Sequence, residues 1–223
     1  MKRMQADEIE PGADHTPYRP DLSPWFVALT EQEAPLDLPH YFEAPQPTVL
    51  DVGCGRGLFL YNASQQRKNC NFLGIEIDFK EGRRGATRLS KLQQPNARVV
   101  GGDVNLLLEK YLVSQCLHEV HVYFPDPWWK KRHHKRRVVT DDFLKLVTDR
   151  LVEEGEFHLW TDVFDYWEMA RGVIESNGNY VELPAPEERM PDDEMDYQTS
   201  FERKKRLAGW HIYRGLWKKK PGV

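Results

Sequence analysis

Long apolar runs and paired cysteines are both missing from this 223-residue chain. No stretch approaches 18 consecutive apolar residues, and no basic start precedes an apolar signal core, so we expect neither a membrane span nor secretion. Cys54, Cys70 and Cys116 form no C-x-x-C pair and have no metal-ligand spacing. This pattern is typical of a cytoplasmic protein whose thiols stay free.

Basic residues are scarce in the first 47 residues, which hold nine acids, three Lys or Arg and eight of the fifteen prolines. Their net charge is −6, against +2 for the rest of the chain. This composition indicates a partly disordered arm over residues 1–47, followed by one folded domain over residues 48–223. A short helix is expected near residues 24–30, because Ser23 is a good N-cap and Pro24 suits the first helical position.

Positive charge is concentrated in the segment Phe-Pro-Asp-Pro-Trp-Trp-Lys-Lys-Arg-His-His-Lys-Arg-Arg, residues 124–137. Six neighbouring cations repel one another, so the segment favours a polyanion such as a phosphodiester backbone as its partner. Asp126 lies between two prolines directly before the cations, where a reacting group would sit. A solvated basic loop is the alternative interpretation. His133 and His134 have no carboxylate or cysteine at a matching interval, so we expect phosphate contacts and no metal site.

A second motif begins at Asp51 and continues through Gly53, Gly55 and Gly57. It follows an apolar run and precedes a helix-compatible segment over residues 58–68, which predicts a strand, a tight turn and a helix. The third glycine comes one residue too early for a dinucleotide fingerprint. A carboxylate two places before the first glycine would repel a pyrophosphate. It suits a ligand with an ammonium and a sulfonium. The pattern D-x-G-x-G-x-G is typical of methyltransferases that use S-adenosylmethionine, although a structural glycine turn remains possible.

Further acids follow the next apolar runs. Glu76 lies about 20 residues beyond the glycines, the separation at which an acid contacts ribose hydroxyls. Asp103 ends a third run and could accept from an adenine amine, Asp126 follows a fourth, and Asp162 follows a fifth. Ligands of open α/β sheets bind outside the carboxyl ends of the strands, so these acids should converge on one crevice.

Taken together, VLDVGCGRG, GIEI, GGD, FPDPWWKKRHHKRR and the distal TSFE with Lys204, Gly209 and Ile212-Tyr213 closely resemble the bacterial tRNA (guanine-N7)-methyltransferase family. The resemblance covers roughly residues 48–217. It implies a Rossmann-like α/β fold of the seven-stranded, class I methyltransferase type, with a mostly parallel sheet and helices on both faces. It also implies methyl transfer from S-adenosylmethionine to N7 of a guanine in the tRNA variable loop, with S-adenosylhomocysteine as the product.

The resemblance further implies roles for individual residues. Methyl-donor contacts come from the glycine turn and four acids, namely Asp51, Gly53, Gly55, Gly57, Glu76, Asp103 and Asp126, with Asp126 also placed at the reacting base. Substrate tRNA contacts come from the basic block and two later segments, namely Lys130, Arg132, His133, His134, Lys135, Arg136, Arg137, Asp162, Thr199, Ser200, Phe201 and Glu202. Trp129 and the basic run 203–206 depart from the family pattern.

Several alternatives stay open at the level of sequence. Trp128 could stack on a base or fix its loop. The segment 126–129 lacks the second proline of an exocyclic-amine methyltransferase, whereas a cap N7-methyltransferase or an RNA-binding module without catalysis remains to be tested. We also expect a helix over 165–176, a short strand over 180–183, a loop over 184–198 and a final edge strand over 210–217. The sequence does not distinguish a monomer from a homodimer.

Overall fold

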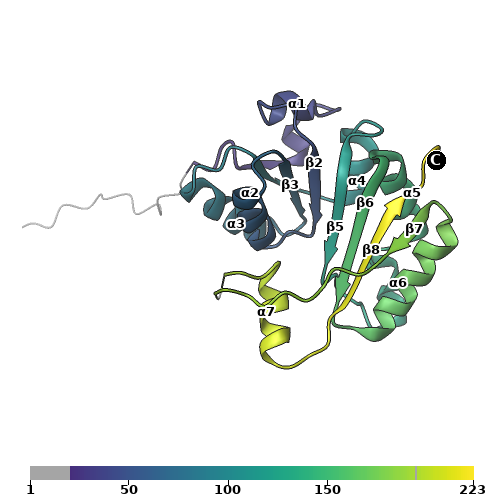
Figure 1. Ribbon diagram of the computed structural model, residues 1–223. Coiled ribbons are helices and arrows are strands. Elements are labelled where there is room, and N and C mark those ends of the chain that lie inside the picture. Colours follow the sequence, from purple (N-terminus) through teal and green to yellow (C-terminus); the bar gives the residue numbers. More distant parts are fainter. Residues whose placement is uncertain (1–20, 194) are drawn as a thin grey trace, which may run out of the picture.

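The computed structural model describes residues 21–193 and 195–223 as one twisted sheet with helices on both faces (Figure 1). The strands are ordered β1-β4-β3-β2-β5-β6-β8-β7, and all neighbours from β1 to β6 are parallel. Their bounds are β1 Phe26–Ala28, β2 Thr48–Val52, β3 Asn71–Glu76, β4 Ala97–Gly101, β5 Leu117–Tyr123, β6 Leu151–Thr161, β7 Tyr180–Leu183 and β8 Tyr213–Lys219. The predicted fold class is confirmed, with β1 as an eighth strand.

Most of the helices connect successive parallel strands. They are α1 Leu38–Tyr41, α2 Leu58–Gln66, α3 Phe79–Lys91, α4 Val104–Leu106, α5 Asp141–Arg150, α6 Phe164–Asn177 and α7 Ser200–Leu207, with short turns of helix at Leu29–Glu31, Leu107–Tyr111 and Lys131–Arg136. Side chains cap several helix starts: Asp78 accepts from the N–H of Lys80, and Thr140 accepts from that of Phe143. Gly178 ends α6 with a left-handed φ of 76°.

Two hydrophobic clusters lie on the two faces of the sheet. One packs α2 and α3 against the strands through side chains such as Phe59 and Leu89. The other packs α5 and α6 through side chains such as Phe143, Val147 and Ile174. Because both faces of the parallel strands are covered, β2 and β4 are buried along their whole length, as a parallel sheet requires.

The helix predicted near residues 24–30 is wrong. Phe26–Ala28 is a strand paired with β4, and a turn of 3-10 helix follows it at Leu29–Glu31. Aromatic and β-branched side chains favour the strand, and the Trp25 carbonyl accepts from the Val99 N–H at 2.8 Å, which extends the pairing along the open edge of β4. Most of the loose chain expected in the arm before this segment belongs to residues 1–20, which lie outside the described residues.

The final strand, predicted over 210–217 as an edge strand, is Tyr213–Lys219 and is antiparallel to its neighbours, but it is not the edge. β8 lies between β6 and β7, because it pairs antiparallel with both strands, and its Trp217 and Lys219 side chains are buried. The Lys219 ammonium donates to the carbonyls of Thr148 and Leu151 at 2.7 and 2.8 Å. The four-residue β7, which is largely exposed, takes the edge position, where short polar strands resist unwanted pairing.

Candidate active site

The crevice forms where the strand order reverses. β2 and β5 are parallel neighbours at the centre of the sheet, and the chain proceeds from β2 to β3 on one side and from β5 to β6 on the other. The loops leaving the two strands therefore diverge, which opens the sheet at its carboxyl edge. The glycine turn follows β2, Asp51 and Glu76 lie near the carboxyl ends of β2 and β3, and Asp103, Asp126 and Asp162 follow β4, β5 and β6 at the same edge.

The glycine turn combines open backbone with close helix packing. Gly53, Gly55 and Gly57 have φ values of 70°, 51° and 64°, which side chains rarely adopt. A Cβ on Gly53 would meet no heavy atom within 4 Å, whereas one on Gly57 would lie 3.1 Å from Cα of Gly85 in α3. The first two glycines thus leave room for a ligand against the main chain, and the third allows the helix to approach.

Glu76, the last residue of β3, is fixed by the glycine turn beside it. Its Oε2 accepts from the Gly55 N–H at 2.8 Å, and its Oε1 accepts from the Asp78 N–H at 2.8 Å. The carboxylate is only partly buried, and each oxygen keeps a second lone pair for a further donor. This geometry suits the two hydroxyls of a ribose.

Asp51 is a buried acid without a cationic partner. Its side chain is 3% exposed and makes no hydrogen bond or ion pair with the residues that the structure describes. Burial, and next the nearby Glu76, raise the pKa of Asp51 to about 8. A buried carboxylate is stabilised by an adjacent positive charge, so this site fits the ammonium and sulfonium of S-adenosylmethionine.

Asp103 follows β4 at the same edge of the sheet. It is exposed, and its carboxylate accepts from the Leu106 N–H at 3.1 Å as the N-cap of α4. One oxygen of this carboxylate is therefore committed to the helix, and the other is available to a ligand. Its predicted contact with adenine stays a prediction.

The loop that carries Asp126 is strained at both ends. Phe124 and Trp128 have φ values of 51° and 46°, a region that costs non-glycine residues about 1–3 kcal/mol each. The Phe124 N–H donates to the Trp160 carbonyl at 2.8 Å, and the Arg137 Nε donates to the Pro127 carbonyl at 2.9 Å. These bonds hold the loop in a shape that leaves Asp126 exposed.

A pocket of about 530 Å³ lies between this loop, the end of β6 and α7. It brings together two of the predicted acids, Asp126 and Asp162, with the predicted tRNA contact Phe201. Sequence reasoning did not assign a role to its other polar and aromatic walls, which include Trp129, Phe164, Asp165, Lys205 and Trp210. The sequence singled out only Trp129 and the basic run 203–206, which includes Lys205, because both differ from the family pattern.

Thr199 and Glu202 do not line this pocket. The Thr199 hydroxyl accepts from the Glu202 N–H at 2.9 Å, and the buried Glu202 carboxylate accepts from the Gln198 N–H at 2.7 Å. Together they cap the start of α7, as the spacing Thr-x-x-Glu allows. Their position shows that they hold the helix that presents Phe201, while Ser200 is exposed on its first turn.

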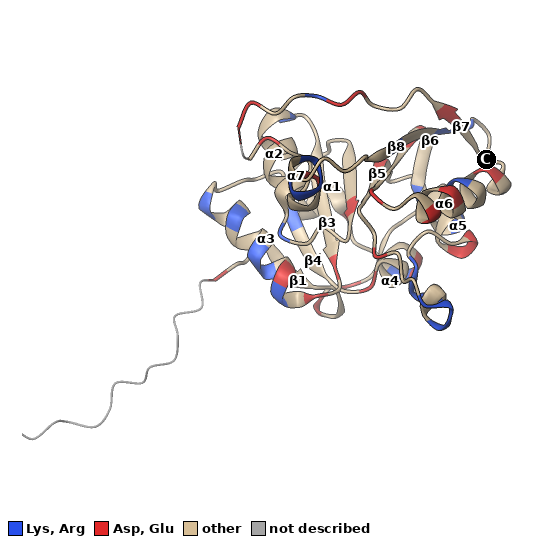
Figure 2. Ribbon diagram, turned by 90° about the horizontal axis from the view of Figure 1, so that it is seen from below, with Lys and Arg blue, Asp and Glu red and all other residues tan. Residues whose placement is uncertain are grey.

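The basic block forms a turn of 3-10 helix on the surface, outside the pocket. Four of the predicted tRNA contacts in or beside it are exposed to solvent, namely Arg132, His134, Lys135 and Arg136, and so is Lys130. Trp128 fixes this loop, because its ring lies 5.0 Å from the Arg136 guanidinium and 5.7 Å from the His133 ring. Arg137 turns inward to the Pro127 carbonyl. Lys and Arg also line α3 and α7 (Figure 2).

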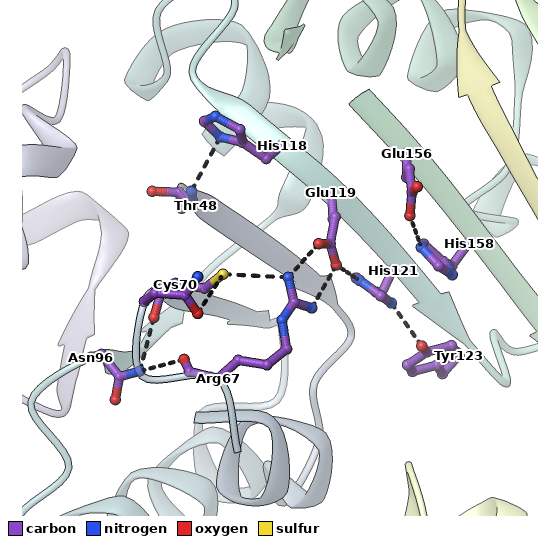
Figure 3. A network of polar contacts seen from close by, with 11 residues as sticks. Thr48, Arg67, Cys70, Asn96, His118, Glu119, His121, Tyr123, Glu156 and His158 are labelled. Atoms are coloured by element: carbon purple, nitrogen blue, oxygen red, sulfur yellow. Dashed lines mark hydrogen bonds and ion pairs between the residues drawn. The ribbon is translucent and has the colours of Figure 1, made fainter. Parts of the chain in front are cut away.

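A polar network lies apart from this pocket, on β5 and β6 (Figure 3). Buried His121 contacts the Tyr123 hydroxyl at 2.7 Å and the Glu119 carboxylate at 2.9 Å, and its ring stacks on that of His158 at 4.1 Å. Glu119 is also paired with Arg67. Glu119, His121 and His158 are close enough together to ligate a metal ion, but these acceptors already have partners. Burial, and next His158, lower the pKa of His121 to about 3.

Comparison with solved structures identifies the fold. The 16S rRNA methyltransferase KamB matches 85% of this chain and 96% of its own length, with a TM-score of 0.61 at 15% identity. The family model of a putative methyltransferase matches residues 45–215. The fold and the crevice are those of a class I methyltransferase that uses S-adenosylmethionine. No helix in the described ranges 21–193 and 195–223 is long and apolar enough to cross a membrane.

Two curated relatives define the family. The tRNA (guanine-N(7)-)-methyltransferase of Rhodopirellula baltica is 37% identical over 90% of this chain and 76% of the relative. That of Halorhodospira halophila is 31% identical over 90% of this chain and 87% of the relative. The chain belongs to the tRNA (guanine-N7)-methyltransferase family.

Proposed function

We propose that this protein transfers a methyl group from S-adenosylmethionine to N7 of a guanine in the tRNA variable loop, and that Asp126 is the carboxylate beside the reacting base. The observation that supports this arrangement is the pocket that joins Asp126 and Asp162 at the ends of β5 and β6, with β2, which the glycine turn follows, as the other neighbour of β5. S-adenosylmethionine supplies an electrophilic methyl group when bound. We place the reaction in the cytoplasm, where tRNA is abundant and the three free cysteines stay reduced.

The reaction needs no general base from the protein. Guanine N7 has an in-plane lone pair and no proton, so the N7–methyl bond forms as the sulfur–methyl bond breaks. The purine becomes cationic, and a carboxylate fixed beside the ring stabilises that developing charge. Asp126 can also accept from the guanine N1 and N2 protons, which selects guanine over other bases.

The remaining residues hold the substrates. Asp51 would hold the cationic groups of the methyl donor, and Glu76 would hold its ribose. Asp162 completes the base pocket together with Phe201. Lys130 and the exposed part of the basic block contact phosphates, which position the tRNA without reading its sequence. Recognition then depends on tRNA shape and on a base exposed from its loop.

Nucleoside mass spectrometry of tRNA after incubation with the protein and S-adenosylmethionine tests this function. We expect N7-methylguanosine at one position. A tRNA in which 7-deazaguanine replaces the target guanine should bind and accept no methyl group, because the nucleophilic nitrogen is absent. Methylation of that tRNA, or a product other than N7-methylguanosine, would refute the proposal.

A further inference from the structure

Exposed aromatic side chains gather at the Asp126–Asp162 pocket. Trp129 and Trp210 are 65% and 56% exposed, and Phe164 and Phe201 are also exposed. Within the described part of the chain, these four are all of the exposed Phe and Trp side chains except Phe79, and all four line the pocket. Such a concentration of solvent-exposed apolar surface marks a binding site rather than a fold requirement.

The pocket has the composition that a purine base requires. Its volume of about 530 Å³ lies within the range of small-ligand pockets, and the carboxylates of Asp126, Asp162 and Asp165 can accept hydrogen bonds from a base edge. Indole rings offer flat faces on which any base can stack. Trp129 arrives from the strained loop after Asp126, and Trp210 arrives from the segment after α7, so two separate parts of the chain supply these faces.

A lysine already occupies one of these faces. The Lys205 ammonium lies 4.3 Å from the centroid of the Trp210 ring and 2.7 Å from the Asp162 carboxylate. The backbone N–H of Trp210 donates to the Lys205 carbonyl at 2.9 Å, which fixes the turn between the two residues. A cation over an aromatic face, paired with an adjacent carboxylate, has the charge arrangement that a methylated purine would have in the same place.

We propose that Trp129 and Trp210 are the stacking platforms for the target guanine and that Lys205 is a placeholder, which leaves Trp210 and Asp162 when the base enters. This inference rests on the proposed function and names how the same pocket recognises its base. Lys205 would exchange its two partners for a tRNA phosphate. Because methylation gives the purine a positive charge, the tryptophans bind the product base more tightly than guanine.

Kinetics with tRNA test the platforms. Trp210→Ala and Trp129→Ala should each raise KM for tRNA about tenfold, the effect expected when one base loses an aromatic stacking partner. Trp210→Phe and Trp129→Phe keep an aromatic face and should restore most of the affinity. Leu207→Ala is the matched control, because Leu207 is 75% exposed on α7 and does not line the pocket. Both tryptophans are largely exposed, so melting curves of the variants should match that of the parent protein.

Ligand titrations provide the second readout. 7-Methylguanosine monophosphate should quench tryptophan fluorescence at lower concentration than guanosine monophosphate, and Trp210→Phe and Trp129→Phe should each remove part of that quenching. If the parent protein methylates tRNA and the Ala variants keep its KM, the platforms are refuted while the proposed function stands. If the parent protein forms no N7-methylguanosine in tRNA, the function fails and the inference fails with it. Lys205→Met should strengthen the nucleotide titration, and an unchanged or weaker titration would overturn the placeholder role.

Discussion

The Gly55 N–H donates a 2.8 Å hydrogen bond to Glu76 Oε2, which joins the glycine turn after β2 to the end of β3. The second oxygen of the same carboxylate accepts from Asp78, the N-cap of α3. One side chain therefore orders two loops and still offers lone pairs to a ligand. Removing the Glu76 side chain should therefore weaken cofactor binding for two reasons: the two loops lose a shared hydrogen-bond acceptor, and the ligand loses one as well.

For this reason Glu76→Ala should raise the Kd for S-adenosylmethionine by roughly tenfold or more, since a hydrogen bond to a charged group contributes about 1.5–3 kcal/mol. Isothermal titration calorimetry measures the change. Glu168→Ala is the control, because Glu168 is an exposed acid on α6, which lies away from the glycine turn. Unaltered affinity in Glu76→Ala would place the ribose elsewhere.

Asp51 should make cofactor binding depend on pH. In the folded protein the pKa of Asp51 is about 8, above the ordinary value near 4, so folding favours the neutral acid. The contribution of this residue to the stability of the fold is therefore lost as pH rises toward 8. A cationic cofactor selects the ionised form, and its affinity should rise between pH 6 and 7.5 with a limiting slope of about tenfold per unit. Calorimetry at several pH values measures this, and Asp51→Asn should flatten the slope. A slope that survives in the Asn variant would exclude Asp51 as its source.

Asp126→Asn should separate chemistry from binding. The substitution keeps the shape of the side chain and removes the charge that stabilises the cationic purine, so kcat should fall much more than tRNA affinity does. Single-turnover kinetics and filter binding measure the two quantities. Asp142→Asn, an exposed acid on α5, should leave both unchanged. An Asn variant that turns over at the parent rate would remove Asp126 from the mechanism.

The structure divides the basic block into two parts with different expected effects. Lys135 and Arg136 are exposed, so replacing both with alanine should weaken tRNA binding and lower the log–log salt slope by about 0.7–0.9 for each lost phosphate contact. Arg137→Ala should in addition loosen the Asp126 loop and lower kcat. Binding measured from 50 to 200 mM salt tests the first statement, with Lys68→Ala/Lys110→Ala as control. An unchanged slope in the Lys135→Ala/Arg136→Ala variant would mean that the basic block is only a solvated surface without phosphate contacts.

His121 should contribute to acid sensitivity. Its folded pKa of about 3 lies below the ordinary value near 6.5, so the unfolded chain binds a proton that the folded protein does not. Stability from this residue is present above about pH 6.5 and is lost as pH falls toward 3. The free energy of unfolding measured in urea should fall between pH 7 and pH 5 by about 1–2 kcal/mol less in His121→Gln than in the parent protein. The Gln amide can keep hydrogen bonds to both neighbours of His121. Equal declines would show that His121 titrates normally.

The sequence by itself determined the fold class, the glycine turn and the acids after each strand. The turn needs residues that tolerate positive φ, and that requirement is visible as Gly53, Gly55 and Gly57. The carboxyl ends of parallel strands meet at one edge in any such sheet, so the positions of Glu76 and Asp126 followed from strand order. The Thr-x-x-Glu spacing at residue 199 also indicates a helix cap, which the structure shows, and the predicted tRNA contacts of Thr199 and Glu202 stay a prediction.

The tertiary structure decided the parts that depend on contacts between distant segments. Only pairing with β4 makes Phe26–Ala28 a strand, because the free edge of the sheet overrides a local helix signal. Pairing with both β6 and β7 places β8 inside the sheet instead of at its edge. The pocket likewise joins three segments far apart in the chain, residues 124–129, 162–165 and 201–210. Which side chains stay exposed, and which of them face one another, is set by packing and has no local signature.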